Sequence, residues 1–400
     1  MRSYKFNASE ILHLFFFSFY PRMSACDNTN TKRVCLDQCE RSQYDDLVEQ
    51  LFGECGDVET ESDGPLLTDA HRAQLDRDGY CVIENVLDAQ EARSLLEGIE
   101  EFIQTLLPGK GLVKPPGVHG ICKHEGGHLR AIWQHVRLNP RVQQAFCEYW
   151  GCTADQLLTS FDGFRYLPAH RKTQSQYAPS RVLSLQGESW AHYDQTLSAA
   201  GRDPRTGRVY DNIQGSVSAV THTGGGGFLV YPGTHLLLPK LWARYQWKDN
   251  FYVLPMDALR QLQTDAREFY PDDHPLRYSA EPVCILPVVV YQPAGSLTLW
   301  RSVVHQSVES NSNSADPSCV VYACMGPRSR ATPRDLQKRL AAFQSNRMTS
   351  HWWHTAKLNA KAPRTYGRVV EPFGDVSHLV VNSIEELGKQ GRSLVCGNLK

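Results

Sequence analysis

The chain has 400 residues, of which 41% are hydrophobic and 21% are charged. This composition is typical of a globular protein with one large domain or two ordinary ones. Lysine and arginine number 42 and aspartate and glutamate 43, so the net charge is -1. This balance argues against nucleic acid or an anionic membrane surface as the partner. Twelve cysteines are scattered along the chain, and we expect most of them to be reduced and buried.

The N-terminal part, residues 1–65, is predicted to be a flexible segment that ends in an acidic stretch at 57–64. An apolar run at 11–20 is shorter than the roughly 20 residues that a membrane helix needs, so we expect no membrane span. A signal or targeting peptide at 1–25 stays open, because basic residues precede this run. We nevertheless expect a cytoplasmic protein, and a monomer.

Residues 66–152 are predicted to be mainly helical, because apolar residues recur at helical spacing after candidate N-caps. The expected elements, in chain order, are a helix at 68–76, a strand at 79–84, a helix from 88 to about 106, a loop at 110–127 and a helical stretch at 128–152 that breaks at Asn139-Pro140.

From about residue 157, short β-type runs alternate with turns of glycine, proline, asparagine and serine. These runs lie at 157–161, 214–220, 227–231, 283–291, 297–300 and 319–324. A helical insert at 234–268 interrupts them, and a further helix is expected at 332–343, with irregular structure from about 347. The spacing predicts a mainly β protein with flanking helices and a double-stranded β-helix (jelly-roll or cupin-like) core. The main domain would span 66–330, with a C-terminal extension at 331–400 that packs on this core.

Two stretches of the β region together predict a metal site, namely the pair His192-x-Asp194 and the distant His305. On an extended strand, residues i and i+2 face the same side, so His192 and Asp194 can reach one cation together. Two histidines and a carboxylate are the facial triad that holds iron(II) in oxygenases and leaves coordination positions open for a co-substrate and O2. The alternative is that His192 and Asp194 form a surface pair and His305 is a hydrogen-bonded core histidine.

Other motifs give weaker predictions. Cys35-x3-Cys39 lacks a matching second pair for a zinc site, and the glycines at 224–227 are not followed by the Gly-Lys-Ser/Thr of a phosphate loop. No Gly-x-Ser-x-Gly elbow indicates a serine hydrolase. His351 and His354 flank two tryptophans and are expected to pack. Four residues of the loop and its end could bind zinc, contact a substrate or be solvated: His119, Cys122, His124 and His128.

These residues resemble the phytanoyl-CoA dioxygenase family of iron(II)- and 2-oxoglutarate-dependent oxygenases. The matching segments occur in the family order and cover residues 66 to about 330. They are the strand at 78–87, the first metal motif at 190–195, the segment 213–215 followed by the Gly-Gly-hydrophobic-Pro-Gly-Thr-His signature at 226–235, and the strand at 295–300 that leads to His305.

The resemblance implies that His192, Asp194 and His305 bind iron(II) and are catalytic. Its co-substrates would be 2-oxoglutarate and O2, with ascorbate in a supporting role. Hydroxylation of a small or medium organic substrate would accompany conversion of 2-oxoglutarate to succinate and CO2. Asp194 argues against a halogenase, which would need the carboxylate removed to admit a halide.

One position departs from the family pattern. The family usually places an arginine about a dozen residues after the last histidine, where its fork binds the distal carboxylate of 2-oxoglutarate. Here Ser318 or Cys319 stands where the arginine is expected. Arg301 and Arg165, on neighbouring strands, are candidates to supply the charge, while Ser318 and Gln214 complete the predicted co-substrate residues.

The missing arginine keeps an alternative function open. The chain could be a catalytically impaired metal-binding or scaffold protein of the same family. The intact triad favours the dioxygenase, because ligands are soon lost once iron chemistry is not needed. A cupin-like zinc or manganese protein is a third possibility, although cupin sites are richer in histidine.

The sequence does not identify the substrate. Loops 110–127 and 170–186 are the expected lids. The candidate substrate contacts, each with core packing or solvation as its alternative, are Trp190, Tyr193, Phe164 and His124.

Overall fold

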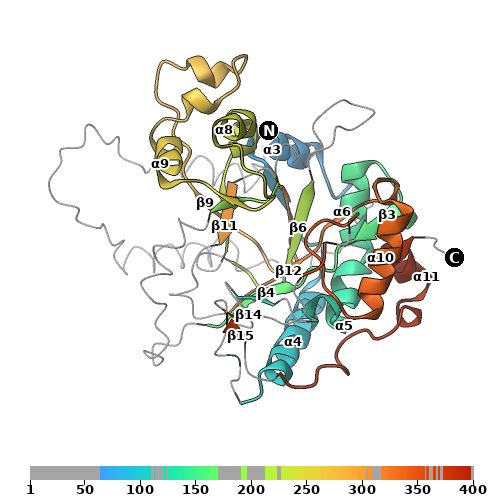
Figure 1. Ribbon diagram of the computed structural model, residues 1–400. Helices are drawn as coiled ribbons and strands as arrows, with labels where there is room; N and C mark the ends of the chain where they lie inside the picture. The colour runs from blue at the N-terminus through green and yellow to red at the C-terminus, as the bar shows by residue number, and fades with distance from the viewer. Residues whose placement is uncertain are drawn as a thin grey trace, which may run out of the picture. The chain divides into compact units, whose positions relative to one another are not determined.

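The computed structural model divides the chain into two units, Met1–Asp63 and Gly64–Lys400, and all described residues belong to the second (Figure 1). For β11, β14 and β15 the structure describes only the backbone. The predicted flexible segment lies outside the described residues except at its end. The described residues are 64–109, 112, 120–122, 125–169, 191–195, 212–222, 227–302, 305–308, 317–355, 357–359, 364–365, 368–369 and 373–397.

The first helices begin at the predicted N-caps. Helix α3 (Asp69–Asp78) starts after Thr68, whose hydroxyl accepts a hydrogen bond from the His71 amide at 3.3 Å, and it ends at Gly79 with φ of 84°. A left-handed conformation is easiest for glycine, so Gly79 stops the helix before strand β1 (Tyr80–Ile83). Helix α4 (Ala89–Leu106) starts after Asp88 and buries its apolar face, as predicted.

The second helical stretch breaks at Asn139, as predicted. A short helix α5 (Arg130–Ile132) continues into a π-helical turn at Trp133–Arg137. Helix α6 (Pro140–Trp150) then begins after Asn139, whose side-chain oxygen accepts a hydrogen bond from the Arg141 amide at 2.9 Å. Proline at the first helical position suits this start, because its missing amide would have no helical partner.

Two antiparallel sheets form the β part. The larger sheet has the order β1-β10-β6-β12-β4-β2, and the smaller one has the order β8-β5-β11-β7-β9. The remaining strands of the larger sheet are β2 (Ile121–Cys122), β4 (Phe164–Leu167), β6 (Ile213–Ser218), β10 (Leu297–Arg301) and β12 (Ser318–Tyr322). The smaller sheet contains β5 (His192–Tyr193), β7 (Phe228–Tyr231), β8 (Tyr252–Val253), β9 (Val288–Val290) and β11 (His305–Val308). Two short pairs stand apart, β3 (Leu157–Thr159) with β13 (Met325–Pro327) and β14 (Arg364–Thr365) with β15 (Arg368–Val369).

The sheets pack against each other through an apolar cluster. Phe228 and Val290 of the smaller sheet contact Trp300 of the larger one, and the rings of Phe228 and Trp300 are 4.8 Å apart. The larger hydrophobic cluster lies between the larger sheet and the helices, where α10 (Pro333–Gln344) and α11 (Gly388–Cys396) also contribute buried residues. In Figure 1, α4, α5, α6, α10 and α11 gather on one side, and α8 (Leu238–Tyr245) and α9 (Met256–Thr264) lie near β9 and β11.

The structure confirms sheets with flanking helices, but the described helices contain more residues than the strands, so the prediction of a mainly β protein is corrected, as are several details. The predicted helical insert contains α8 (Leu238–Tyr245) and α9 (Met256–Thr264) but also strand β8 between them. The apolar run at 283–291 forms only β9. Helix α11 lies where irregular structure was expected. Its short apolar pattern is a weak helix signal by itself, and the helix is stabilised by packing on α10 and β3.

In the described part of the chain, no helix is long and apolar enough to cross a bilayer. None of the eight cysteines in this part of the chain belongs to a disulfide bond.

Candidate active site

A cavity of about 210 Å³ lies between the two sheets. The larger sheet contributes five of its polar and aromatic lining residues and the smaller sheet two: Arg165, Gln214, Ser216, Trp300, Tyr322, His192 and Phe228. A segment after α10 closes it with Thr349, Ser350, His351 and Asn359. The cavity therefore brings together parts of the chain that are far apart in sequence.

His192 and Asp194 converge at this cavity. His192 begins β5 and is 4% exposed, and its Nε2 lies 3.5 Å from Oδ1 of Asp194. The other carboxylate oxygen, Oδ2, accepts a hydrogen bond of 3.0 Å from the side-chain amide of Gln214 on β6. Burial alone would raise the pKa of Asp194, but the adjacent imidazole of His192 and the bond from Gln214 hold it below its ordinary value. The carboxylate form, which a metal requires, is thus favoured before any metal binds.

The third predicted ligand, His305, begins β11. The backbone of β11 pairs with β5, Gln306 lying opposite His192, and with β7, His305 lying opposite Tyr231. The pairing brings the distant His305 to the strand beside His192. Among the described side chains, no group of three or more histidine, cysteine, aspartate or glutamate residues could hold a metal ion, and the His305 side chain is outside that set.

The donor atoms present fit iron(II). An imidazole nitrogen and a carboxylate oxygen face one cavity from neighbouring backbone positions, and the backbone of β11 adds a second histidine position next to them. A mixed nitrogen and oxygen set suits a borderline cation such as iron(II). Gln214 holds one oxygen of Asp194 in place, as outer hydrogen bonds commonly do for metal ligands.

Arg165 places a guanidinium at the cavity wall. It lies on β4 opposite Val320 of β12 and is 1% exposed. Its Nη2 donates a hydrogen bond of 3.0 Å to the hydroxyl of Ser318 on β12, and Tyr322 is a further hydrogen-bond partner. Burial lowers the pKa of Arg165, but an arginine remains protonated. The cavity thus contains a cation beside the position where the family arginine is missing.

A chain of buried hydrogen bonds extends from Arg165. The Ser318 hydroxyl lies 2.9 Å from Nε2 of His222, and Nδ1 of His222 lies 2.9 Å from the hydroxyl of Ser218. Ser218 donates to the Val220 carbonyl at 2.9 Å, so it accepts from Nδ1–H of His222. Nε2 of His222 then accepts from Ser318, whose oxygen accepts from Arg165.

The protonation state of His222 is consistent with these donor and acceptor assignments. Burial, followed by the nearby charge of Arg165, lowers the pKa of His222 to about 3, so the imidazole is neutral with one donor and one acceptor nitrogen. His222 was not among the residues predicted to bind the co-substrate. No sequence motif marks it, because its role depends on a strand pairing between distant segments.

The structure places Arg301 away from the cavity. Its Nη2 donates to Oδ1 of Asp76 at 2.5 Å and its Nε to the Leu75 carbonyl at 3.2 Å, both on α3. Side chains alternate along a strand, so Trp300 faces the cavity and Arg301 faces the other side of β10. The prediction that Arg301 binds the co-substrate is therefore corrected, because its side chain bonds to α3. Of the two candidate arginines, Arg165 alone lines the cavity.

The same alternation places two of the predicted aromatic substrate contacts outside the cavity. Phe164 adjoins Arg165 but points into the main core, with its ring 5.9 Å from that of Phe102. Tyr193 adjoins His192 but stacks on Trp247 at 5.6 Å. Both are fully buried away from the cavity lining. Trp190, His124 and the loop 170–186 lie outside the described residues, as does most of the loop 110–127.

His128 is a core histidine. Its ring lies 5.4 Å from each of the rings of Phe161 and Phe343, and its Nε2 is 3.1 Å from the Arg347 carbonyl. Burial lowers the pKa of His128 to about 4. Its position favours packing over zinc binding, while the side chain of Cys122 lies buried on β2.

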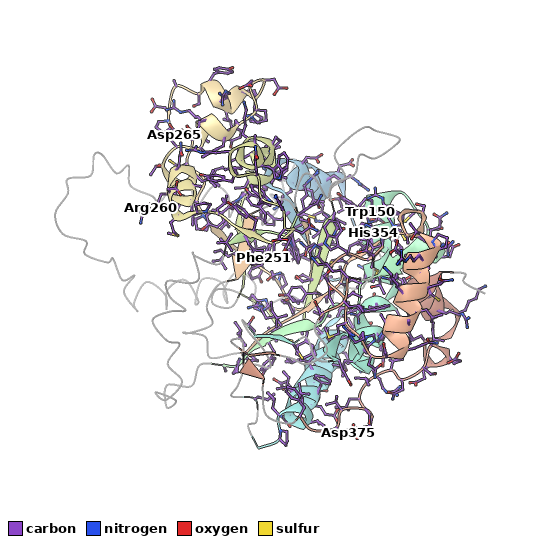
Figure 2. All side chains as sticks on the ribbon, viewed as in Figure 1. Trp150, Phe251, Arg260, Asp265, His354 and Asp375 are labelled. Atoms are coloured by element: carbon purple, nitrogen blue, oxygen red, sulfur yellow. The ribbon has the colours of Figure 1, made fainter. Side chains whose placement is uncertain are left out.

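The two histidines beside the tryptophans differ from each other. His354 packs against Trp352 and Trp353, at 5.7 and 5.0 Å, as predicted, and Figure 2 labels it on the side where the helices gather. His351, however, lines the cavity and forms a hydrogen bond with the backbone of Asp194. The rings of His351 and Trp352 are 5.1 Å apart, so the packing prediction holds for His351 as well, whereas its place in the cavity lining was not predicted.

Comparison with known proteins gives one family match. The family model described as Phytanoyl-CoA dioxygenase (PhyH) matches residues 75–315. Among curated proteins, none matches the chain. Similar solved structures include EctD from S. alaskensis with bound Fe, at 15% identity and a TM-score of 0.38, covering 68% of this chain and 81% of that one.

Two further solved structures are similar. GIG2 from Candida albicans is 15% identical with a TM-score of 0.45, covering 82% of this chain and 76% of that one. HygX from Streptomyces hygroscopicus, with nickel, 2-oxoglutarate and hygromycin B bound, is 12% identical with a TM-score of 0.38, covering 65% and 88%. At these low TM-scores the family match is the informative comparison.

Proposed function

Because the chain belongs to the phytanoyl-CoA dioxygenase family over residues 75–315, we propose that it is an iron(II)- and 2-oxoglutarate-dependent dioxygenase. It hydroxylates a small or medium organic molecule and converts 2-oxoglutarate to succinate and CO2, on a double-stranded β-helix core. One observation carries the proposal: His192, Asp194 and a buried arginine, Arg165, line the same cavity.

His192, Asp194 and His305 are the residues that would hold the metal. Iron(II), when bound, supplies open coordination positions for a keto acid and O2. Gln214 has a supporting role, since its bond to Oδ2 of Asp194 orients the carboxylate and leaves Oδ1 toward His192. The pKa of Asp194, held below its ordinary value, keeps this ligand ionised at neutral pH.

Arg165 would bind the distal carboxylate of 2-oxoglutarate. A carboxylate brought into a closed cavity needs a cation, and an arginine fork gives it two hydrogen bonds. Arg165 comes from β4, and Ser318 on the adjacent β12 holds its Nη2. The serine at the family's arginine position would thus orient an arginine from the next strand, which favours an active enzyme over the impaired alternative.

Anaerobic titration tests this proposal. Iron(II) and 2-oxoglutarate are added to the full-length protein, the visible charge-transfer band of the chelate is recorded, and succinate is measured after O2 and ascorbate are admitted. We expect a band and succinate from the wild type, and loss of iron binding in His192→Ala and Asp194→Ala with the fold retained.

A matched control is His235→Ala. His235 is a half-buried histidine that bonds to the Asp76 carbonyl at 3.0 Å, outside the cavity lining, so this variant should keep iron and turnover. A wild type that binds iron but gives neither band nor succinate would favour the scaffold alternative. Full turnover in Asp194→Ala would overturn the metal assignment.

A further inference from the structure

One wall of the cavity lies outside the part of the chain that matches the family. This C-terminal wall consists of Thr349, Ser350, His351 and Asn359, whereas the family match ends at residue 315. Lining residues that lie beyond the family match are where a feature particular to this chain, such as substrate choice, would be built.

The C-terminal wall is anchored at its start. The Thr349 amide donates to the Phe161 carbonyl at 3.2 Å, and the Phe161 amide donates to the Thr349 hydroxyl at 2.9 Å. The side-chain amide of Asn359 donates to the Thr349 carbonyl at 3.0 Å. The polar groups of Thr349 and Asn359 are thus used to hold the wall together.

The wall is also anchored just beyond His351. Trp353 is fully buried, and a Cβ added at Gly326 would lie 2.2 Å from its indole ring. The guanidinium of Arg339 donates to the Trp353 carbonyl. Ser350 and His351 are therefore held between two fixed points, and a preformed wall binds a ligand without a large ordering cost.

Two polar atoms of this wall lack a protein partner. Among the described residues, Ser350 Oγ and His351 Nε2 are buried without a hydrogen bond, and so is Nε1 of Trp300, which lines the cavity from β10. A buried polar atom left unbonded is destabilising, because it loses its hydrogen bonds to water without gaining others. Unbonded atoms also occur in the helical core, at His128 Nδ1 and Trp133 Nε1. Those two residues do not line the cavity. Ser350 Oγ, His351 Nε2 and Trp300 Nε1 belong to cavity residues, so a bound molecule can form the hydrogen bonds that they lack.

The charges around the cavity disfavour a second anionic group at this wall. Asp162 and Asp194 line the cavity and would repel a second anion. The cation there, Arg165, is already assigned to 2-oxoglutarate, and His351 contacts the backbone of Asp194. Phe251, which Figure 2 labels, adds an apolar surface to the cavity. Its ring lies 4.5 Å from that of His192.

We infer that Ser350 and His351 bind a neutral hydrogen-bonding group, a hydroxyl or a carboxamide, of the primary substrate. This inference rests on the proposed function and names the substrate class of that same cavity. The bound group would lie beside Asp194, so the wall would hold the rest of a compact, polar molecule near the metal position. A long hydrocarbon chain would leave these polar atoms unsatisfied.

Four probes with one ring and different polar groups test the inference: cyclohexanol, cyclohexanecarboxamide, cyclohexanecarboxylate and cyclohexylammonium. The full-length protein is loaded with Mn(II) and 2-oxoglutarate, and paramagnetic broadening of each probe's proton NMR signals reports binding near the metal. We expect broadening of the alcohol and the carboxamide. Ser350→Ala and His351→Ala should each weaken it about tenfold, the loss of roughly one hydrogen bond.

His354→Ala is the matched control, because His354 is the same residue type in the same segment but does not line the cavity. It should leave probe binding unchanged, and thermal unfolding checks that each variant is folded. Broadening of the carboxylate or ammonium probe instead, no broadening of any probe, or equal binding by His351→Ala would overturn the inference. A wild type that takes up neither Mn(II) nor 2-oxoglutarate would overturn the proposed function instead.

Discussion

Arg339 and Arg137, on the helical side of the larger sheet, and Arg165, at the cavity, are all buried, but their hydrogen-bond partners differ. Arg339 donates to the main-chain carbonyls of four residues. Arg137 donates to the carbonyls of three. Arg165 instead bonds to the side-chain hydroxyl of Ser318 and to Tyr322, and it lines the cavity.

The comparison separates a structural role from a binding role. A guanidinium bonded to several carbonyls ties distant loops together, because each carbonyl would otherwise be buried without a donor. A guanidinium held by hydroxyls at a cavity is oriented but keeps its charge near an anionic ligand. If this distinction is correct, substitutions in the two settings should affect different measurements.

The largest effect is expected for Arg339→Met. Loss of the charged donor leaves the carbonyls of Thr159, Trp353, Leu394 and Val395 without their partner. The free energy of unfolding should fall by about 3–5 kcal/mol, measured by chemical denaturation. An equal loss in Arg165→Gln would break the proposed distinction between the two settings.

His128 provides a pH-dependent test on the helical side. Burial lowers its pKa in the folded protein from 6.5 to about 4, so between these values the unfolded state binds the extra proton. The stabilising contribution is complete above the unfolded pKa and is lost as the pH falls toward the folded one. The loss should reach about 3 kcal/mol at most.

The variant His128→Phe should flatten this dependence. Its free energy of unfolding, compared with that of the wild type at several values across the same pH window, should change less as the pH falls. A wild-type stability that stays constant across the window would contradict the assignment of His128 as a neutral core residue. Binding of 2-oxoglutarate at neutral pH should be unaffected by the substitution.

Arg165→Gln tests the cavity side. Removing the cation should raise the dissociation constant of 2-oxoglutarate about 100-fold, or roughly 2.7 kcal/mol, while iron binding stays unchanged. The matched control is Arg301→Gln, which removes an arginine bonded to Asp76 on α3 and should leave the constant unchanged. Anaerobic titration of the iron-loaded protein measures both, and equal constants for Arg165→Gln and the wild type would exclude Arg165 as the anchor.

The smallest effect is expected for His222, which acts on Arg165 through Ser318. His222→Leu removes the acceptor for the Ser318 hydroxyl and should weaken 2-oxoglutarate binding about tenfold. His222→Gln should restore most of the affinity, because its amide can accept from Ser318 and donate to Ser218. If His222→Leu binds 2-oxoglutarate as tightly as His222→Gln does, the hydrogen-bond chain does not position Arg165.

Much of the local structure was predictable because its causes are local. The helix starts at Thr68, Asp88 and Asn139 follow from side chains that cap the next amides. The pair His192-x-Asp194 could be found because both residues lie within one short segment. Helix α11 was missed, since its packing partners α10 and β3 are distant in sequence.

The face of each strand was harder to predict than the strand itself. Neighbouring residues of a strand face opposite sides, so an error of one residue places a core side chain in the cavity. For this reason Phe164 and Tyr193 were predicted as substrate contacts, whereas their neighbours Arg165 and His192 line the cavity. Trp300, next to Arg301, was missed for the same reason. Alternation alone does not reveal which face the second sheet covers.

The amino-acid sequence by itself determined the family, the capped helices and the candidate metal-binding segment, because these depend on residue types at short and regular spacing. Only the tertiary structure decided which arginine faces the cavity, how Ser318 and His222 hold it, and that His351 closes the opposite wall. Those relations arise from strand pairing and from a returning C-terminal segment, and contacts between such distant positions depend on how the whole chain packs.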